Sequence, residues 1–209
     1  MSLFQDWFAR MMQTESGVKE PEAMALSTVT MSPNKDYAIP STRIVLAKEI
    51  SDSQVIFYSN YDSRKGREIA ANPWASAAFY WRDVSLSVRL VGKVSRLSEE
   101  VSDQYFNSRP IGSRVGAWAS QQSQPIASRD ALQVKIKEAE MRLGVHESPA
   151  DEAKENQQHV EKPPYWGGYA ITPVEVEFWA GRESRLHDRF RYTREGVEAK
   201  EWKVERLCP

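Results

Sequence analysis

The chain has 209 residues, a formal net charge of −1 at pH 7 and a single cysteine, Cys208. Its length can bury one sizeable core, and its near-neutral charge gives no global case for binding nucleic acid or a membrane surface. One cysteine excludes an internal disulfide framework and favours a reducing compartment. No apolar run approaches the ~20 residues of a membrane span, so we expect a cytoplasmic protein.

The first half of the chain predicts two helices and a series of strands. Residues 3–13 carry apolar side chains at helical spacing, which predicts an amphipathic helix. Asp62 or Ser63 is expected to cap a second helix, which ends before Pro73. Strand-like composition marks residues 23–31, 42–47, 55–59, 75–81 and 87–97. Gly92 is expected at a bulge or a close backbone approach.

The second half begins with two predicted helices. Ser98 and Ser128 each precede a helical pattern and are expected to act as caps, and Pro110 with Gly112 is expected to break the first helix. Residues 146–162 are polar without periodicity, which predicts a surface loop or a disordered insert. Three more strands are expected over 169–172, 174–179 and 202–207.

This order of elements favours a mainly β fold with flanking α-helices. Strands outnumber long helices, and short turns join many consecutive strands. An antiparallel sheet or barrel is therefore expected, rather than βαβ winding.

Several chemistries have no support in the sequence. The three histidines, His146, His159 and His187, are far apart, and no spacing of metal-ligating residues is present. The chain also lacks a Gly-x-Gly-x-x-Gly after a strand, a P-loop and a Gly-x-Ser-x-Gly. We expect no metal site, no Rossmann-type nucleotide site and no serine hydrolase.

The segment Arg185-Leu186-His187-Asp188-Arg189 places charged groups at alternate positions. In an extended segment Arg185, His187 and Arg189 would point to one face. Two fixed cations and a titratable ring on one face suit an anionic ligand, although a solvated charged strand has the same pattern.

Further cations stand at chain breaks. Arg64 and Lys65 fall in the first turn of a predicted helix, where free amides and the helix dipole favour an anion. Arg109 and Ser113 flank the break at Pro110. Together these residues indicate more than one phosphate and a phosphorylated-ligand enzyme.

Arg43 and Lys48 bracket one apolar run. Their positions have opposite parity, so in a regular strand their side chains face opposite sides unless Lys48 lies past the strand end.

Six strings, in this order along the chain, resemble the pyridoxamine 5′-phosphate oxidase family. They cover parts of residues 3–145 and 163–209. The strings are Ser41-Thr42-Arg43-Ile44-Val45-Leu46-Ala47-Lys48, Ser59-Asn60-Tyr61-Asp62-Ser63-Arg64-Lys65-Gly66, Tyr105-Phe106-Asn107-Ser108-Arg109-Pro110, Gly116-Ala117-Trp118-Ala119-Ser120-Gln121-Gln122-Ser123, Tyr165-Trp166-Gly167-Gly168-Tyr169 and Arg185-Leu186-His187-Asp188-Arg189.

The resemblance implies a single domain over residues 1–209, an antiparallel split β-barrel that binds flavin mononucleotide (FMN). It also implies a homodimer with active sites at the subunit interface. By position, the implied flavin contacts are Arg43, Tyr58, Ser59, Arg64, Lys65, Gln122, Ser123, Trp179 and Arg189. The implied substrate-phosphate contacts are Lys48, Tyr105, Arg109 and Ser113. Arg185 and His187 are implied to cover the substrate ring and to be catalytic.

The implied reaction oxidises pyridoxamine or pyridoxine 5′-phosphate to pyridoxal 5′-phosphate in vitamin B6 salvage. Hydride would pass from the substrate C4′ carbon to the flavin, and dioxygen would reoxidise the flavin to give hydrogen peroxide. Arg185 would hold the substrate ring, and His187 would relay a proton.

Two alternatives stay open at the level of the sequence. Ser87 occupies the position where the family usually has a flavin-contacting glutamine. A serine is too short to make the same contact, so the contact is either lost or made by water or Arg89. One alternative is a phenazine-biosynthesis type of FMN oxidase, which the strings Asn72-Pro73-Trp74-Ala75-Ser76 and Tyr80-Trp81-Arg82 resemble. The other is a non-catalytic protein that binds flavin or pyridoxal phosphate, and Ser87 is its only support in the sequence.

Overall fold

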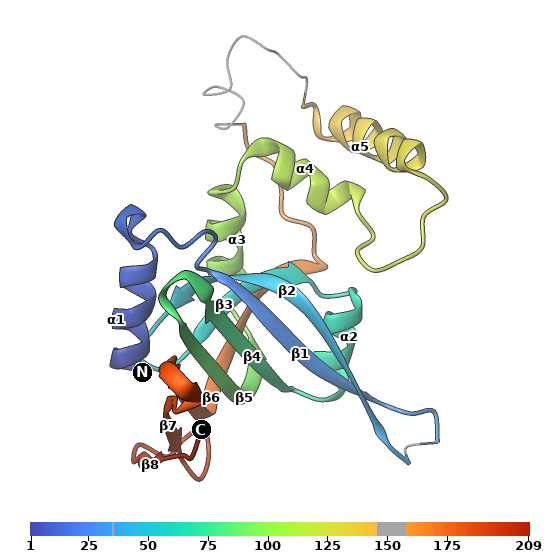
Figure 1. Ribbon diagram of the computed structural model, residues 1–209. Helices are drawn as coiled ribbons and strands as arrows, with labels where there is room; N and C mark the ends of the chain where they lie inside the picture. Colours follow the sequence, from blue (N-terminus) through green and yellow to red (C-terminus); the bar gives the residue numbers. More distant parts are fainter. Residues whose placement is uncertain (35, 146–157) are drawn as a thin grey trace. The chain divides into compact units, whose positions relative to one another are not determined.

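Eight strands form one sheet in the computed structural model, which describes residues 1–34, 36–145 and 158–209. The strands are β1 (Ala23–Met31), β2 (Ala38–Ile50), β3 (Val55–Asn60), β4 (Trp74–Trp81), β5 (Leu86–Arg96), β6 (Trp166–Ala180), β7 (Asp188–Thr193) and β8 (Lys203–Arg206). Their order is β3-β2-β1-β4-β5-β6-β7-β8, and β3 also pairs with β6 (Figure 1). The sheet thus closes on itself from β3 to β6, and β7 and β8 extend it.

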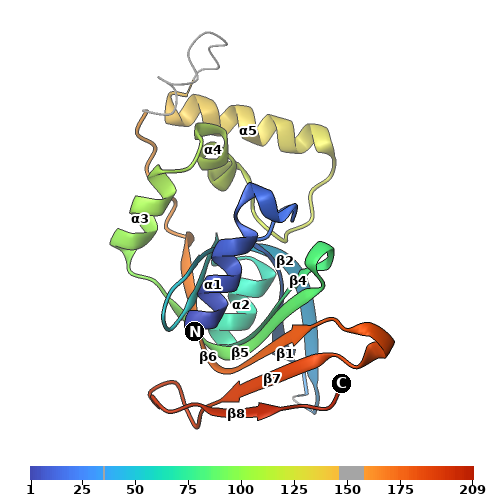
Figure 2. The ribbon, with the colours of Figure 1, turned by 60° about the vertical axis from the view of Figure 1, so that its left-hand side comes forward.

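The pairing is antiparallel between β1 and both of its neighbours, and again for β2–β3, β4–β5, β6–β7 and β7–β8. This confirms the mainly β, antiparallel class expected from the sequence. Figure 2 shows β6, β7 and β8 side by side at the C-terminal end of the sheet.

The chain divides into two compact units. Unit 1 comprises Met1–Phe57, Glu68–Ser95 and Tyr169–Pro209, and unit 2 comprises Tyr58–Arg67 and Arg96–Gly168. The expectation of one domain over the whole chain stays a prediction.

The core of unit 1 forms where alternating strand residues meet the first helix, α1 (Ser2–Met11). In β4 every second residue is buried, which leaves Phe79 inside. Phe4 of α1 is fully buried, and its ring centroid lies 5.2 Å from that of Phe79 and 6.5 Å from that of Phe178. These edge-to-face contacts hold the helix against the sheet.

A close backbone approach fixes β5 beside β6. A Cβ atom at Gly92 would lie 2.5 Å from the carbonyl oxygen of Thr172, so only glycine fits there. Of the two alternatives predicted for Gly92, the structure has the close approach.

Unit 2 carries the remaining helices, α3 (Glu99–Asn107), α4 (Ile111–Ala119) and α5 (Arg129–Leu143), while α2 (Arg64–Ala71) begins in it. Ser98 Oγ accepts a hydrogen bond from the Val101 amide, and Ser128 Oγ accepts one from the Ala131 amide. Both predicted caps are confirmed. The helices share an apolar cluster of buried residues that includes Phe106, Val115, Ala139 and Trp166.

The predicted break before Pro110 is confirmed, because α3 ends at Asn107. The helix α4 was not expected: Pro110 immediately precedes its first residue, and Gly112 lies inside it. A proline breaks a helix interior but is well tolerated at a helix start, where no backbone hydrogen bond is lost. The break therefore separates two helices.

The C-terminal strands differ from the prediction in two ways. β6 runs without interruption through Pro173, where two strands were expected, and the strand β7 was not expected. The segment before β7 is not extended, because Glu183–Arg185 forms a short 3-10 turn in which Ser184 and Arg185 have φ of 56° and 61°. The expected alternation of Arg185, His187 and Arg189 along one strand is wrong for that reason.

The predicted insert falls partly on residues 146–157, which lie outside the described residues. Its last part is packed: the carbonyl of Gln158 accepts from Arg114 Nη1 at 2.7 Å, and Lys162 Nζ donates to Glu99 Oε2 at 2.7 Å. Among the described residues, no helix is both long and apolar enough to cross a membrane.

Candidate active site

The ammonium group of Lys65 is the centre of a polar cluster in unit 2. Lys65 is the second residue of α2, and its side chain is turned inward and is 7% exposed. Its Nζ donates to Gln122 Oε1 at 2.6 Å, Ser59 Oγ at 3.0 Å and Ser63 Oγ at 3.3 Å. Ser59 Oγ donates to Gln122 Oε1 at 3.2 Å. Three predicted flavin contacts, Ser59, Lys65 and Gln122, thus come together.

Two other predicted flavin contacts neighbour this cluster in sequence and are exposed. Arg64 is the first residue of α2, and Ser123 lies in the turn after α4 with φ of 69°. Gln122 itself also lines a pocket of about 840 Å³ in unit 2, together with Trp118 and Arg142.

An aromatic stack joins a predicted flavin contact to a predicted substrate contact. The rings of Tyr58 and Tyr105 are stacked with centroids 3.8 Å apart, and Trp166 lies parallel to both at 5.6 and 6.3 Å. Burial raises the pKa of the Tyr105 hydroxyl. The stack fixes the end of α3 against the start of β6.

Arg109 lies over this stack, in the turn between α3 and α4. Its guanidinium carbon is 4.7 Å from the Trp166 ring centroid, and burial lowers the pKa of this arginine. Its Nη1 is buried and has no hydrogen-bond partner among the described residues. A buried guanidinium N–H without an acceptor is unfavourable, and a phosphate oxygen would satisfy it. Ser113, the fourth predicted phosphate contact, is exposed on the first turn of α4.

In unit 1, Arg43 is tied to a buried carboxylate. Arg43 Nη2 lies 3.1 Å from Glu68 Oε2, which also accepts from Ser41 Oγ at 2.8 Å and from Thr28. Glu68 is 5% exposed. Arg43 is therefore held inside the sheet by α2, which the sequence did not reveal.

Lys48 lies at a bulge in β2. The register with β3 shifts between Ala47 and Glu49, so Lys48 is the extra residue, and it is exposed. Lys48 thus lies within the strand, and Arg43 is half-buried among inward residues. The alternative that Lys48 follows the strand end is therefore wrong. The opposite-face prediction assumed a regular strand, and because the bulge interrupts the alternation at Lys48, it stays a prediction.

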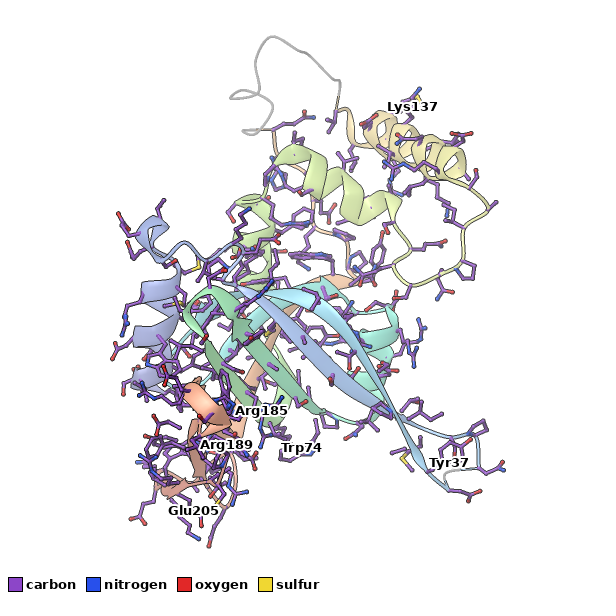
Figure 3. All side chains as sticks on the ribbon, in the orientation of Figure 1. Tyr37, Trp74, Lys137, Arg185, Arg189 and Glu205 are labelled. Atoms are coloured by element: carbon purple, nitrogen blue, oxygen red, sulfur yellow. The ribbon has the colours of Figure 1, made fainter. Side chains whose placement is uncertain are left out.

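His187 packs against Trp179 in unit 1, with ring centroids 4.6 Å apart. The backbone amide of Arg182 donates to His187 Nδ1 at 3.1 Å. A neutral ring with Nδ1 as acceptor carries its proton on Nε2, which follows from this hydrogen bond. Arg185 is exposed on the turn before β7, and Figure 3 labels it there.

A pocket of about 480 Å³ in unit 1 contains two predicted flavin contacts, Trp179 and Arg189, which pair across β6 and β7. Ser87, where the family's glutamine is missing, lines the same pocket, as does Arg89. Arg189 Nε lies 2.7 Å from Glu177 Oε1, so this cation has an acidic partner.

The described residues fit FMN. An ammonium group with hydroxyls around Lys65 suits a phosphate, because each can donate a hydrogen bond to its oxygens. The pocket with Trp179 and Arg189 offers an aromatic ring and a guanidinium, which suit a planar heterocycle with carbonyl oxygens. Within the described residues, no group of three or more His, Cys, Asp or Glu side chains could hold a metal ion.

Sequence reasoning missed Glu68 and Glu177, the two buried carboxylates that hold predicted flavin arginines. Neither belongs to a motif. For Glu177 a signal existed, because Glu175, Glu177 and Trp179 alternate along one strand and therefore share a face.

Comparison with known proteins gives two family matches. Residues 12–143 match the model of the pyridoxamine 5′-phosphate oxidase family, and residues 166–209 match that of the pyridoxine 5′-phosphate oxidase C-terminal dimerisation region. A pyridoxine/pyridoxamine 5′-phosphate oxidase of Burkholderia mallei is 45% identical over 206 residues, covering 99% of this chain and 87% of the relative. One from Burkholderia thailandensis is 44% identical with the same coverage.

Two solved structures are similar over the whole chain. PhzG from Burkholderia lata 383, in complex with tetrahydrophenazine-1-carboxylic acid, is 33% identical with a TM-score of 0.83, covering 100% of this chain and 91% of its own. A pyridoxamine 5′-phosphate oxidase-related, FMN binding protein from Nostoc punctiforme is 18% identical with a TM-score of 0.70, covering 99% and 97%. The second likeness concerns the fold alone, and the two likenesses confirm the split-barrel fold class expected from the sequence.

Proposed function

Because the chain belongs to the pyridoxamine 5′-phosphate oxidase family, we propose that it oxidises pyridoxamine or pyridoxine 5′-phosphate to pyridoxal 5′-phosphate, with FMN as cofactor and dioxygen as acceptor. The observation that carries the proposal is the buried Nη1 of Arg109, which has no hydrogen-bond partner among the described residues. It supports a phosphorylated substrate, because a phosphate oxygen would satisfy that donor.

The substrate phosphate binds in unit 2 at Arg109 with Tyr105 and Ser113. The role of Lys48, which lies in unit 1, stays a prediction from the family resemblance. The stack with Tyr58 and Trp166 holds the Tyr105 ring in place, and the cation–π contact with Trp166 orients the Arg109 guanidinium. Because this phosphate does not react, these residues contribute chiefly to substrate affinity.

The cofactor phosphate binds at the Lys65 cluster. Lys65, Ser59 and Gln122 contact one another there, and we assign the remaining flavin contacts to Arg43, Tyr58, Arg64, Ser123, Trp179 and Arg189. When bound, FMN would supply the two-electron redox chemistry that couples oxidation of the substrate C4′ carbon to reduction of dioxygen.

For the amine substrate, the overall reaction conserves atoms and electrons. The primary amine, dioxygen and water give the aldehyde, ammonia and hydrogen peroxide, so two electrons leave C4′ and reduce dioxygen. For the alcohol substrate, water is not consumed and ammonia is not formed.

Arg185 and His187 act on the substrate, and the His187 ring lies against the Trp179 ring. Arg185 holds the substrate ring in the reacting orientation. His187 uses Nε2 to hold or move a proton, because its Nδ1 is occupied by the amide of Arg182. The left-handed backbone at Ser184 and Arg185 costs about 1–3 kcal/mol for each residue, and such strain is typical of functional sites.

A homodimer completes the proposal. Ile44 is 66% exposed on β2, and its register partner Ala25 pairs in turn with Ala78 of β4. These residues therefore share one face of the sheet, on which Tyr80 is 62% exposed. An apolar face of this kind suits a second copy of the chain, and the match of residues 166–209 to a dimerisation region supports it. In this proposal the active sites lie at the subunit interface, and the whole chain acts as one FMN-binding domain in a reducing cytoplasm.

A second candidate function is oxidation of a phenazine precursor. The similarity to PhzG and the small Ser87 in the pocket with Trp179 favour it, because a serine leaves more space for a bulky ring than glutamine does. The buried Nη1 of Arg109, which has no partner among the described residues, favours the phosphorylated substrate instead.

Parallel assays separate these candidates. The purified protein is reconstituted with FMN and given pyridoxamine 5′-phosphate, pyridoxine 5′-phosphate or a dihydrophenazine carboxylic acid in air, and aldehyde and peroxide are followed. We expect equal amounts of pyridoxal phosphate and peroxide from the first two substrates. Turnover of the phenazine precursor alone would establish the second candidate, and FMN binding without turnover of any substrate would indicate a flavin carrier.

A further inference from the structure

The acidic residue Glu177 is buried in β6 between two arginines of unit 1. It is 4% exposed, and each of its two carboxylate oxygens accepts hydrogen bonds from a different arginine. Oε1 accepts from Arg189 Nε at 2.7 Å, and Oε2 accepts from Arg89 Nε at 2.9 Å. Arg89 Nη2 also lies 2.8 Å from Oε2. One carboxylate therefore joins β5, β6 and β7 through two guanidinium groups.

The two arginines differ in their other partners. Arg89 has a second carboxylate, since its Nη2 lies 2.8 Å from Glu175 Oε1. Arg189 Nη1 instead donates to the carbonyl of Cys208 at 3.0 Å. Among the described residues, Glu177 is thus the one carboxylate that contacts Arg189, and Glu175 contacts only Arg89 of the pair.

Both arginines line the pocket of about 480 Å³ together with Trp179 and Ser87. Without the Glu177 charge, two guanidinium groups would remain close to each other with reduced compensation, and each would turn toward water or another acceptor. The position of Arg189 in this pocket therefore depends on Glu177.

We propose that Glu177 is a positioning residue for the flavin: it holds Arg189 in the pocket at the orientation that contacts the cofactor, and it keeps Arg89 beside Ser87 on the same wall. This inference rests on the proposed function, because it takes Arg189 as a flavin contact. Glu177 lies outside the six strings that resemble the family. The inference also places Arg89 in the wall of the pocket beside Ser87, the position where the family usually has glutamine.

Glu177→Gln tests the inference, because it removes the charge and nearly preserves the shape. Apoprotein is titrated with FMN, and flavin fluorescence reports the dissociation constant. We expect Glu177→Gln to weaken FMN binding on the order of tenfold or more, as loss of an outer partner of a ligating group does. Glu175→Gln is the matched control, since it removes a carboxylate from Arg89 without touching Arg189, and we expect less than about a twofold change.

A double-variant cycle separates positioning from general stability. If Glu177 acts through Arg189, then Arg189→Gln combined with Glu177→Gln binds FMN no more weakly than Arg189→Gln alone. Full additivity of the two losses would overturn the inference. Glu177→Asp keeps the charge on a shorter side chain and should retain part of the affinity, and it serves as the second variant if Glu177→Gln does not fold.

The outcomes also distinguish this inference from the proposed function. Wild-type protein that binds FMN and turns over the phosphorylated substrate, with Glu177→Gln binding FMN as tightly, would overturn the role of Glu177 alone. Wild-type protein that neither binds FMN nor turns over would overturn the proposed function and this inference with it.

Discussion

The predicted site cations have different partners in the two units of the chain. In unit 1, Arg43 and Arg189 are held by the buried carboxylates Glu68 and Glu177 at 3.1 and 2.7 Å. In unit 2, the Arg109 guanidinium lies over the Trp166 ring, and its buried Nη1 has no hydrogen-bond partner among the described residues. A carboxylate fixes a cation's direction but cancels much of its charge, whereas an aromatic ring leaves the charge of Arg109 for an anion. We infer that the carboxylates of unit 1 orient Arg43 and Arg189 and that unit 2 presents Arg109 to a phosphate.

We expect the largest loss of turnover at Arg185, a cation of unit 1 that has no acidic partner among the described residues. The side chain of Arg185 is exposed and makes no hydrogen bond or ion pair with the described residues. Because we assign it to the substrate ring, Arg185→Ala should lower turnover by about 100-fold or more through loss of orientation. Flavin content, measured from the visible spectrum, should stay nearly unchanged. Equal turnover of variant and wild type would remove Arg185 from the site.

The next effect tests the phosphate assignment of unit 2. Arg109→Gln removes a charged donor, so kcat/KM for pyridoxamine 5′-phosphate should fall roughly 10- to 100-fold, chiefly through KM. Steady-state kinetics measures this. Arg129→Gln, at an exposed arginine that begins α5, is the control and should change neither constant. A loss confined to kcat would contradict binding of the non-reacting phosphate.

A third variant separates cofactor phosphate from flavin ring. Lys65→Met should weaken FMN binding by roughly tenfold while leaving riboflavin, which has no phosphate, almost unaffected. Fluorescence titration with both flavins gives the two constants. Lys137→Met, at an exposed lysine of α5 labelled in Figure 3, should alter neither. Equal losses for FMN and riboflavin would place Lys65 away from the phosphate.

A fourth variant restores the residue that the family usually has in unit 1. Ser87→Gln adds a hydrogen-bonding amide to the pocket with Trp179 and Arg189, so FMN should bind about 2- to 10-fold more tightly. Ser95→Gln, at an exposed position of the same strand, is the control. Weaker FMN binding by Ser87→Gln would mean that Arg89 or the flavin already fills this space.

The smallest effect is a pH dependence at Glu177. Burial raises the pKa of this carboxyl, but hydrogen bonds from Arg189 and Arg89 outweigh burial and hold the pKa below its ordinary value. A carboxyl with a lowered folded pKa stabilises the fold fully above its unfolded pKa of about 4.3 and loses that contribution as the pH falls. The difference in unfolding free energy between wild type and Glu177→Gln should therefore be constant from pH 8 to about 6 and shrink below about pH 4.5. A difference that grows on acidification would contradict the ion pairs.

The regular parts of the fold were predictable because their signals are local. The alternation in β1 and β4 and the caps Ser98 and Ser128 lie within a few residues of the structure they specify. The helix α4 was missed because Pro110 has opposite effects at a helix start and in a helix interior, and sequence alone did not distinguish them.

The site was predictable only in its residue types. The six strings contain these cations, but the carboxylate partners of Arg43 and Arg189 lie outside them. Glu68 is 25 residues from Arg43, and Glu177 is 12 from Arg189. Such pairs are set by sheet register and helix packing, which the chain specifies only as a whole. The turn at Ser184 likewise has no local signal, since a left-handed backbone at a serine is unfavourable in isolation.

The inference that unit 2 presents Arg109 to a phosphate is tested most directly by the preference of the wild-type holoenzyme for a phosphorylated substrate. The measurement is kcat/KM for pyridoxamine 5′-phosphate against unphosphorylated pyridoxamine, in air, with FMN bound. We expect a preference for the phosphorylated substrate of about 100-fold or more, because Arg109 then gains the acceptor that its buried donor requires. Equal values for the two substrates would contradict this assignment, since Arg109 would then bind no substrate phosphate.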